Sequence, residues 1–147
     1  MVGRGSEVTG WIVGVLGVAP FAAAAGVYGW GPPELAGPAL LALLTYAAAI
    51  LSFLGGVRWG AEIVAPAPRP PVVVLSVLPP LAAWALLALP FATPERQIGG
   101  FLVMFLACWL WDANAEDLPP WYRRLRTVLT LGAGAALGVA LEQTLSL

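Results

Sequence analysis

Residues 35–57 read LAGPALLALLTYAAAILSFLGGV, a run of apolar and small side chains that contains no charged residue. As an α-helix rising 1.5 Å per residue, this run is about 35 Å long, enough to cross the roughly 30 Å hydrocarbon core of a bilayer. Four further charge-free runs cover 8–33, 70–94, 97–111 and 127–141. Together these runs predict a protein built from transmembrane helices.

The composition of the whole chain supports the same class. Of its 147 residues, 60% are hydrophobic and 10% are charged, and the mean hydropathy is +0.86. A soluble core of this size could not bury so much apolar surface. We therefore predict an all-α integral membrane protein, with residues 1–147 forming a single membrane domain. It is expected to be a compact bundle of five transmembrane helices, with spans at 9–30, 35–58, 72–91, 97–113 and 126–146.

The placement of the arginines decides whether the short fourth run spans the membrane. If it does, six of the arginines share one face, which the positive-inside rule assigns to the cytoplasm; if it does not, the division is three against four. We therefore expect five spans, a cytoplasmic N-terminus and a periplasmic C-terminus. The expected cytoplasmic arginines are Arg4, Arg58, Arg69, Arg123, Arg124 and Arg126, and only Arg96 lies opposite. Frequent Ala, Gly and Arg without lysine favours a bacterial inner (cytoplasmic) membrane.

The chain contains no histidine and no lysine. Histidine ligation of haem, zinc or di-iron and Schiff-base chemistry are therefore excluded. Cys108 is the single cysteine, so no internal disulfide or thiolate cluster forms, and we expect it to be a small packing residue. We predict no catalytic residue, no metal and no cofactor, no nucleic-acid partner, and a chain that is not an enzyme.

Prolines predict breaks inside two spans. Pro20 is expected to kink the first span, because it removes a helical donor. The Pro79-Pro80 pair does the same in the third span, so the carbonyls near Leu75 and Ser76 need a partner from a neighbour, water or a ligand. Four further prolines predict a stiff, extended cytoplasmic segment before the third span, here called the strap: Pro66, Pro68, Pro70 and Pro71. Arg69 lies in this strap, and the positive-inside rule alone accounts for its position.

Glycines at four-residue spacing allow helix backbones to approach closely. Gly10 and Gly14 have this spacing in the first span, and Gly134 and Gly138 have it in the fifth. We favour packing within the chain over a dedicated oligomer interface for both pairs, because such spacing is common in membrane sequences rich in Gly and Ala.

The densest group of unusual residues lies at the end of the second span. One interpretation is structural: Arg58 extends to anionic headgroups, Trp59 lies at the interface, and the glycines permit packing. The other gives Arg58 a fixed partner or an anionic ligand. Asp112, at the end of the fourth span, is the expected partner, with Glu62 as the competing acid. The candidate structural or ligand-contact residues are Tyr46, Ser52, Gly55, Gly56, Arg58, Trp59 and Asp112.

A second candidate region precedes the fifth span, where residues 119–126 read PPWYRRLR. Its aromatic and basic side chains are typical of an anchor at anionic headgroups, and recognition of a particular acidic lipid or of a partner's carboxylates is the alternative. The candidate anionic-lipid contacts are Trp121, Tyr122, Arg123, Arg124 and Arg126.

Residues 50–60 (ILSFLGGVRWG) and 119–126, with Pro20 and Asp112, also resemble the bacterial and mitochondrial family of transmembrane protein 69, which is defined by a domain of unknown function numbered 3429. The resemblance covers nearly the whole chain, and residues 50–60 are its most specific part. It implies a small polytopic inner-membrane protein and supplies no catalytic residue.

Two classes of function remain open. The first is a non-catalytic accessory, assembly or stabilising subunit that packs against a larger inner-membrane complex, such as a respiratory or photosynthetic one, because the loops are short and ionisable groups inside the spans are few. The alternative is a small transporter or a lipid- or quinone-binding protein, in which Tyr46, Ser52 and Arg58 line a cavity beside the broken third span. The expected partners are membrane lipids and other membrane-protein subunits.

Overall fold

The computed structural model describes residues 3–90 and 92–147, and every regular element in that part of the chain is a helix. Residue 91, the last residue of the span expected at 72–91, and the first two residues of the domain lie outside the described residues. In chain order the helices are α1 (Arg4–Leu16), α2 (Ala19–Trp30), the 3-10 turn η1 (Pro33–Leu35), α3 (Ala36–Ile63), α4 (Pro70–Ser76), α5 (Leu78–Ala88), α6 (Pro94–Ala113) and α7 (Pro120–Leu145).

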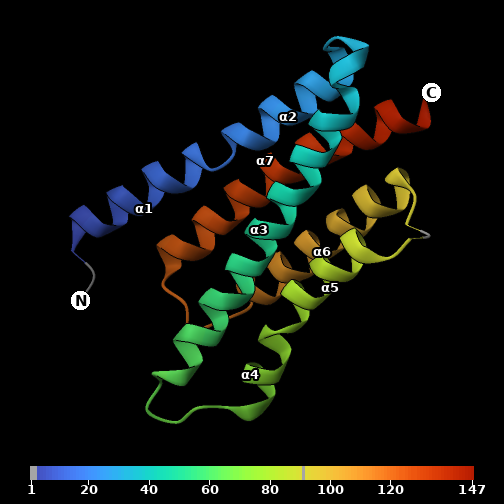
Figure 1. Cartoon of the computed structure of the whole chain (residues 1–147). Coiled ribbons are helices and arrows are strands. Elements are labelled where there is room, and N and C mark those ends of the chain that lie inside the picture. The colour runs from blue at the N-terminus through green and yellow to red at the C-terminus, as the bar shows by residue number, and fades with distance from the viewer. Residues whose placement is uncertain (1–2, 91) are drawn as a thin grey trace.

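These helices form five rods that run alternately up and down the bundle (Figure 1). α1 and α2 make the first rod, and α4 and α5 make the third. α3 contacts α2, α4, α5 and α6, while α7 contacts α1, α2 and α6. Therefore α3 and α7 hold the bundle together, and α1 lies at its edge with none of its residues buried.

Four segments are long and apolar enough to cross a membrane by length and composition: Arg4–Trp30, Pro33–Ile63, Pro70–Ala88 and Pro120–Leu145. α6 occupies the expected fourth span but is not among them, because Glu95, Arg96 and Asp112 lower its apolarity. It is nevertheless part of the core, since Ile98, Phe101 and Phe105 are buried.

Two helices extend beyond the predicted membrane spans in a way that matters for the site. α3 continues past the span predicted at 35–58 to Ile63, so Arg58 lies inside the helix. α7 begins at Pro120, six residues before the span predicted at 126–146. Proline fits the first turn of a helix because the N–H that it lacks has no helical partner there. As a result, Arg123, Arg124 and Arg126 lie on α7, and their positions along this helix determine which face of it each side chain occupies.

The first span is interrupted next to Pro20, where the sequence predicted a disturbance. α1 ends at Leu16, α2 begins at Ala19 with Pro20 in its first turn, and a short non-helical stretch separates them (Figure 1). Tyr46 in α3 donates its hydroxyl to the carbonyl oxygen of Gly17 in this break, with an O···O distance of 2.6 Å. This polar side chain in an apolar helix therefore satisfies a backbone acceptor that the break leaves inside the bundle.

The third rod breaks in the same way, since α4 ends at Ser76 and α5 begins at Leu78 with Pro79 in its first turn. The Ser76 carbonyl faces α3 at Gly55, where a Cβ atom would lie 2.5 Å from that oxygen and 2.9 Å from Cδ of Pro80. Only glycine lets the two backbones approach so closely. Gly55 is therefore a packing residue that admits the broken helix.

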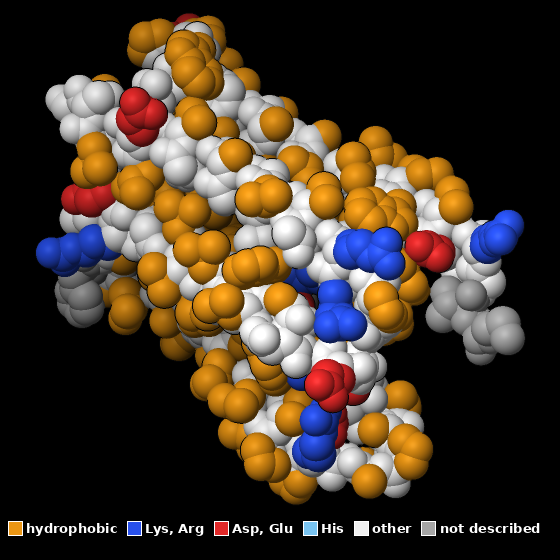
Figure 2. Space-filling view, turned by 180° about the vertical axis from the view of Figure 1, so that it is seen from behind, with side chains coloured by type: hydrophobic (Ala, Val, Ile, Leu, Met, Phe, Trp, Pro, Cys, Tyr) orange, Lys and Arg blue, Asp and Glu red, His pale blue; other side chains and the backbone are white. Residues whose placement is uncertain are grey.

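Aromatic side chains fill the middle of the bundle. Phe21 of α2 makes edge contacts with Tyr46 of α3 and with Phe105 of α6, at centroid distances of 4.8 Å and 5.8 Å. Outside this core, apolar side chains cover most of the face in Figure 2, and charged side chains gather toward two ends of the molecule. This distribution matches a helical bundle whose middle lies in hydrocarbon and whose ends reach polar surroundings.

The two neighbouring glycines of α3 provide a test of this packing. Gly55→Ala is expected to lower the stability of the detergent-solubilised protein by about 1–3 kcal/mol, because its methyl group would overlap the Ser76 carbonyl. Gly56→Ala is the matched control, since within residues 3–90 and 92–147 no atom other than the adjacent backbone of α3 lies within 4 Å of a Cβ at Gly56. It is expected to be neutral or to stabilise α3 by up to about 1 kcal/mol. Thermal unfolding in micelles measures both, and equal effects of the two changes would contradict this packing.

Candidate functional site

Six charged side chains meet near the strap and the α6–α7 loop, where α3 and α6 end and α7 begins. Three are arginines and three are carboxylates, and they alternate in sign along a chain of ion pairs, so their charges cancel. This ion network consists, in order, of Arg126, Asp112, Arg58, Asp117, Arg69 and Glu62.

The inner end of the ion network is the pair of Arg126 and Asp112. Arg126 Nε donates to Asp112 Oδ2 at 2.7 Å, and both side chains are only 2% exposed. Arg126 Nη1 reaches Thr130 Oγ1 at 3.4 Å, one helical turn along α7. This is a short, charge-assisted hydrogen bond inside the protein, and it fixes α6 against α7.

Arg126 is therefore buried and paired with Asp112, and it is not an exposed side chain that could reach headgroups at the membrane surface. Because α7 begins at Pro120, Arg126 lies almost two turns inside the helix, on its buried face. The residues of that buried face can be recognised in the sequence, because they recur every three or four positions, as residues on one side of an α-helix do. This face consists of Arg126, Thr130, Ala133, Leu137 and Ala140.

Arg58 is the second partner of Asp112, as the sequence predicted, but it is the more distant one. Its Nε lies 3.8 Å from Asp112 Oδ1, and neither atom has a hydrogen-bond partner. Arg58 Nη1 lies 3.5 Å from Asp117 Oδ2, and the guanidinium stacks over the ring of Trp111 at 4.4 Å. The cation–π contact and two carboxylates therefore compensate a guanidinium that is 4% exposed.

Glu62, the acid expected to compete for Arg58, is instead held by Arg69. The two oxygens of Glu62 accept from Arg69 Nε at 3.0 Å, from Arg69 Nη2 at 2.8 Å and from the Arg69 backbone N–H at 2.5 Å. Arg69 Nη2 also reaches Asp117 Oδ2 at 3.1 Å. The hydrogen bond with Glu62 raises the pKa of Arg69. Arg69 therefore does more than set the topology: it ties the strap to α3 and to the α6–α7 loop.

The remaining residues of the expected lipid anchor differ in exposure. Arg124 is exposed, whereas Trp121, Tyr122 and Arg123 are half-buried. Trp121 lies against Gly10 of α1, where a Cβ would meet its ring at 3.0 Å, and its ring makes an edge contact with Tyr122. Arg123 Nη1 lies 3.5 Å from the Ala113 carbonyl oxygen. Of this group, Arg124 is the arginine whose side chain is free to extend to headgroups.

The three polar residues expected to line one cavity are separated. Tyr46 borders a hollow between α1, α2, α3 and α7, whereas Arg58 borders another beside Asp117. Ser52 is exposed and donates to the Ala48 carbonyl of its own helix at 2.8 Å. Trp59 is 44% exposed, as an interfacial aromatic would be. These positions give no support to a shared pathway through Tyr46, Ser52 and Arg58.

Chemically, the ion network binds its own members. Each of its carboxylates lies within 4 Å of at least one guanidinium, so none stands apart as an acid or base. Cys108 is buried and unpaired. Within residues 3–90 and 92–147, no three His, Cys, Asp or Glu side chains are grouped to hold a metal ion. The network's evident role is to connect three helices and two loops.

Fold and site together define a helical membrane protein in which six charged residues are paired within its own bundle. The chain belongs to the family described as Protein of unknown function (DUF3429), whose model matches residues 7–142. It is 37% identical over 129 residues to Transmembrane protein 69 of Xenopus tropicalis, an alignment that covers 82% of this chain and 49% of that protein. The chain thus spans about half the length of this relative. No solved structure matches it.

Removing the carboxylate shared by the two buried arginines should be costly. Asp112→Asn leaves Arg126 and Arg58 without their common counter-charge and is expected to destabilise the protein by about 3–5 kcal/mol. Asp117→Asn is the control, because the Asp117 side chain is 39% exposed, and it should cost less than about 1 kcal/mol. Unfolding in detergent measures both. Similar losses in the two variants would contradict a buried network organised around Asp112.

A double-mutant cycle separates the two partners of Asp112. Arg126→Gln and Arg58→Gln, each combined with Asp112→Asn, give the coupling energy of each pair. The 2.7 Å contact to Arg126 is expected to couple more strongly than the 3.8 Å contact to Arg58. Strict additivity in the Arg126 cycle, or stronger coupling in the Arg58 cycle, would contradict the geometry.

Proposed function

We propose that this chain is a non-catalytic accessory, assembly or stabilising subunit of a larger complex in the bacterial inner membrane, such as a respiratory or photosynthetic complex. The observation that carries the proposal is an uncovered small-residue face on α7. Within the described residues, no atom lies within 4 Å of a Cβ built on Gly134 or on Gly138. This face fits the closely approaching transmembrane helix of another subunit.

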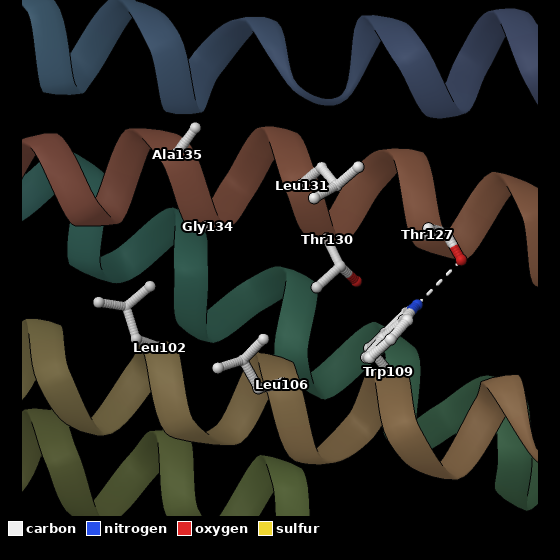
Figure 3. A pocket seen from close by; sticks show the side chains of 8 residues that line it. All are labelled: Leu102, Leu106, Trp109, Thr127, Thr130, Leu131, Gly134 and Ala135. Atoms are coloured by element: carbon white, nitrogen blue, oxygen red, sulfur yellow. Dashed lines mark hydrogen bonds between the residues drawn. The ribbon is translucent and has the colours of Figure 1, made fainter.

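Gly134 lies in a groove between α6 and α7 of about 450 Å³ (Figure 3). The groove is almost wholly apolar, and a hydrogen bond of 2.9 Å from Trp109 Nε1 to Thr127 Oγ1 joins its two walls. α6 contributes Leu102, Leu106 and Trp109, and α7 contributes Thr127, Thr130, Leu131, Gly134 and Ala135. Its length along two turns of α7 suits the side chains of one packed helix.

The other glycine pair shows what an occupied face looks like in this fold. Gly10 and Gly14 of α1 lie against Trp121 and Leu125 of α7, with 3.0 Å between a built Cβ and each side chain. That pair serves packing within the chain, as expected. The same expectation fails for Gly134 and Gly138, whose Cβ positions are open, and this contrast favours an external partner at α7.

The proposal includes a topology of five spans, with α6 as the fourth. The N-terminus, the α3–α4 connection and the α6–α7 connection lie at the same end of the bundle (Figure 1). Six of the arginines belong to that end, and Arg96 begins α6 at the other. The positive-inside rule then supports a cytoplasmic N-terminus and a periplasmic C-terminus. The neutralised charges of the ion network support passage of α6 through the membrane despite Asp112.

Cysteine labelling tests this topology. In a Cys108→Ser background, Glu34→Cys should react with a membrane-impermeant maleimide in intact spheroplasts. Ala67→Cys and Glu116→Cys should react only after permeabilisation, because the strap and the α6–α7 loop are expected in the cytoplasm; all three positions are exposed. Labelling of position 67 or 116 in intact spheroplasts would contradict the orientation, and labelling of only one of these two would contradict five spans.

Native gels of mildly solubilised membranes test the subunit role. The wild-type chain should migrate with a large complex, and Gly134→Leu should release it, because a leucine side chain fills the groove. The released variant should keep the thermal stability of the isolated chain, since its Cβ position is open. Gly56→Leu is the matched control: its position on α3 is equally open, and it should remain in the complex. A wild-type chain that migrates alone, or equal release by both variants, would contradict the proposal.

A further inference from the structure

A second hollow borders a different face of α7 from the groove. It lies between the α1–α2 rod, α3 and α7, with Phe105 of α6 also bordering it, and it encloses about 300 Å³. We call it the Arg126 cavity. Its walls are apolar except at two places, where Arg126 and Tyr46 border it.

Arg126, one of the residues that border this cavity, has an unused donor. Its Nε is taken by Asp112 and its Nη1 by Thr130, but its Nη2 is buried and has no hydrogen-bond partner. The whole residue is 2% exposed, so its guanidinium is held inside the bundle and does not extend into solvent. A buried guanidinium N–H without an acceptor is costly, and native structures ordinarily supply one.

The local charge specifies the kind of acceptor. The inner end of the network, around Arg126, consists of Arg126, Asp112 and Arg58, which together carry two positive charges and one negative charge. Glu62 is also deeply buried, but it is paired with Arg69 at the other end of the network. Asp117, which balances Arg58, is 39% exposed and lies farther out. The surroundings of Arg126 therefore favour an oxygen with a full or partial negative charge.

The other end of the cavity favours a hydrocarbon. Tyr46 has already donated its hydroxyl proton to the Gly17 carbonyl, so it offers no second donor. Phe21 and Ala133 complete that end. Arg126 and Ala133 are seven residues apart on α7, a distance of about 10 Å along the helix axis. A molecule that fills the cavity thus needs one acceptor oxygen at an end and an apolar body of that length.

The edge of the bundle supplies a route for such a molecule. α1 has no buried residue, and its Val13, which borders the cavity, is 64% exposed. This exposure is on a rod that the composition places in the membrane. The cavity is therefore open to acyl chains from the side, and its entrance does not require passage through the polar ends of the bundle.

We propose that the Arg126 cavity binds an amphiphile whose carbonyl or carboxylate oxygen accepts a hydrogen bond from Arg126 Nη2 and whose apolar chain extends between α1 and α3 toward Tyr46. A fatty acid and an isoprenoid quinone both carry this chemistry. The site is separate from the groove at Gly134, so it stands whether or not the chain is a subunit of a complex.

The test compares three probes on the delipidated, full-length protein in detergent. Laurate carries a carboxylate, decylubiquinone carries carbonyl oxygens, and dodecane has the chain without a head. At least one of the first two is expected to raise the melting temperature saturably, because binding to the folded state stabilises it, and dodecane is not. Laurate alone indicates a fatty-acid site, and decylubiquinone alone a quinone site. No saturable shift with either, or an equal shift with dodecane, would overturn the proposal.

Variants of α1 locate the bound probe without disturbing the ion network. Val13→Trp should fill the entrance and weaken binding at least tenfold. Val15→Trp is the matched control, because Val15 is also exposed on α1 but does not border the cavity; it should bind as the wild type does. A third variant lies within the ion network: Arg126→Lys keeps the positive charge but loses both the Nη2 donor and the Nε bond to Asp112, and its binding of the headed probes should fall by a similar factor. Equal binding by Val13→Trp and Val15→Trp would place the probe elsewhere and refute the assignment.

Discussion

The hydrogen bond between Arg126 and Asp112 organises this protein, because each side chain is tolerable inside the bundle only in the presence of the other. A lone carboxylate at the end of α6 or a lone guanidinium two turns into α7 would carry a large desolvation cost. Paired at 2.7 Å, they fix α6 and α7 in one register. Arg58 then joins α3 to the same carboxylate, and through Asp117 and Arg69 the loops follow.

A second constraint operates in the middle of the bundle, where prolines interrupt two rods. In each case α3 supplies the remedy, through the hydroxyl of Tyr46 at Gly17 and through the missing side chain of Gly55 at Ser76. These two solutions differ in kind, since one adds a donor and the other removes an obstacle. Both explain why residues that are unusual in a transmembrane helix lie on the helix that contacts most of the others.

Much of this fold is visible in the sequence, because the length of charge-free runs and the positions of prolines act locally. The helical class, the break at Pro20 and the proximity of Arg58 and Asp112 follow from such local patterns. The role of Arg126 does not, since it depends on helix phase, and phase depends on the start of α7 at Pro120. If Arg126 is grouped with the neighbouring basic residues, it is expected to be exposed like Arg124. If it is grouped with residues 130, 133, 137 and 140, which share one face of α7, it is expected to be buried. The difference between Gly55 and Gly56 likewise depends on which face meets α5.

The weak apolarity of α6 also bears on how the chain is made. An aspartate on a helix that enters the bilayer alone opposes insertion by up to about 3 kcal/mol near the helix centre. During synthesis α3 emerges before α6, so Arg58 is already in place when Asp112 arrives, and Arg126 follows only fourteen residues later. The α6–α7 hairpin thus brings its own counter-charge to the insertion machinery. In the proposed five-span topology, the insertion of the last two helices is therefore expected to be cooperative, because completion of α7 supplies the counter-charge that α6 needs in the membrane.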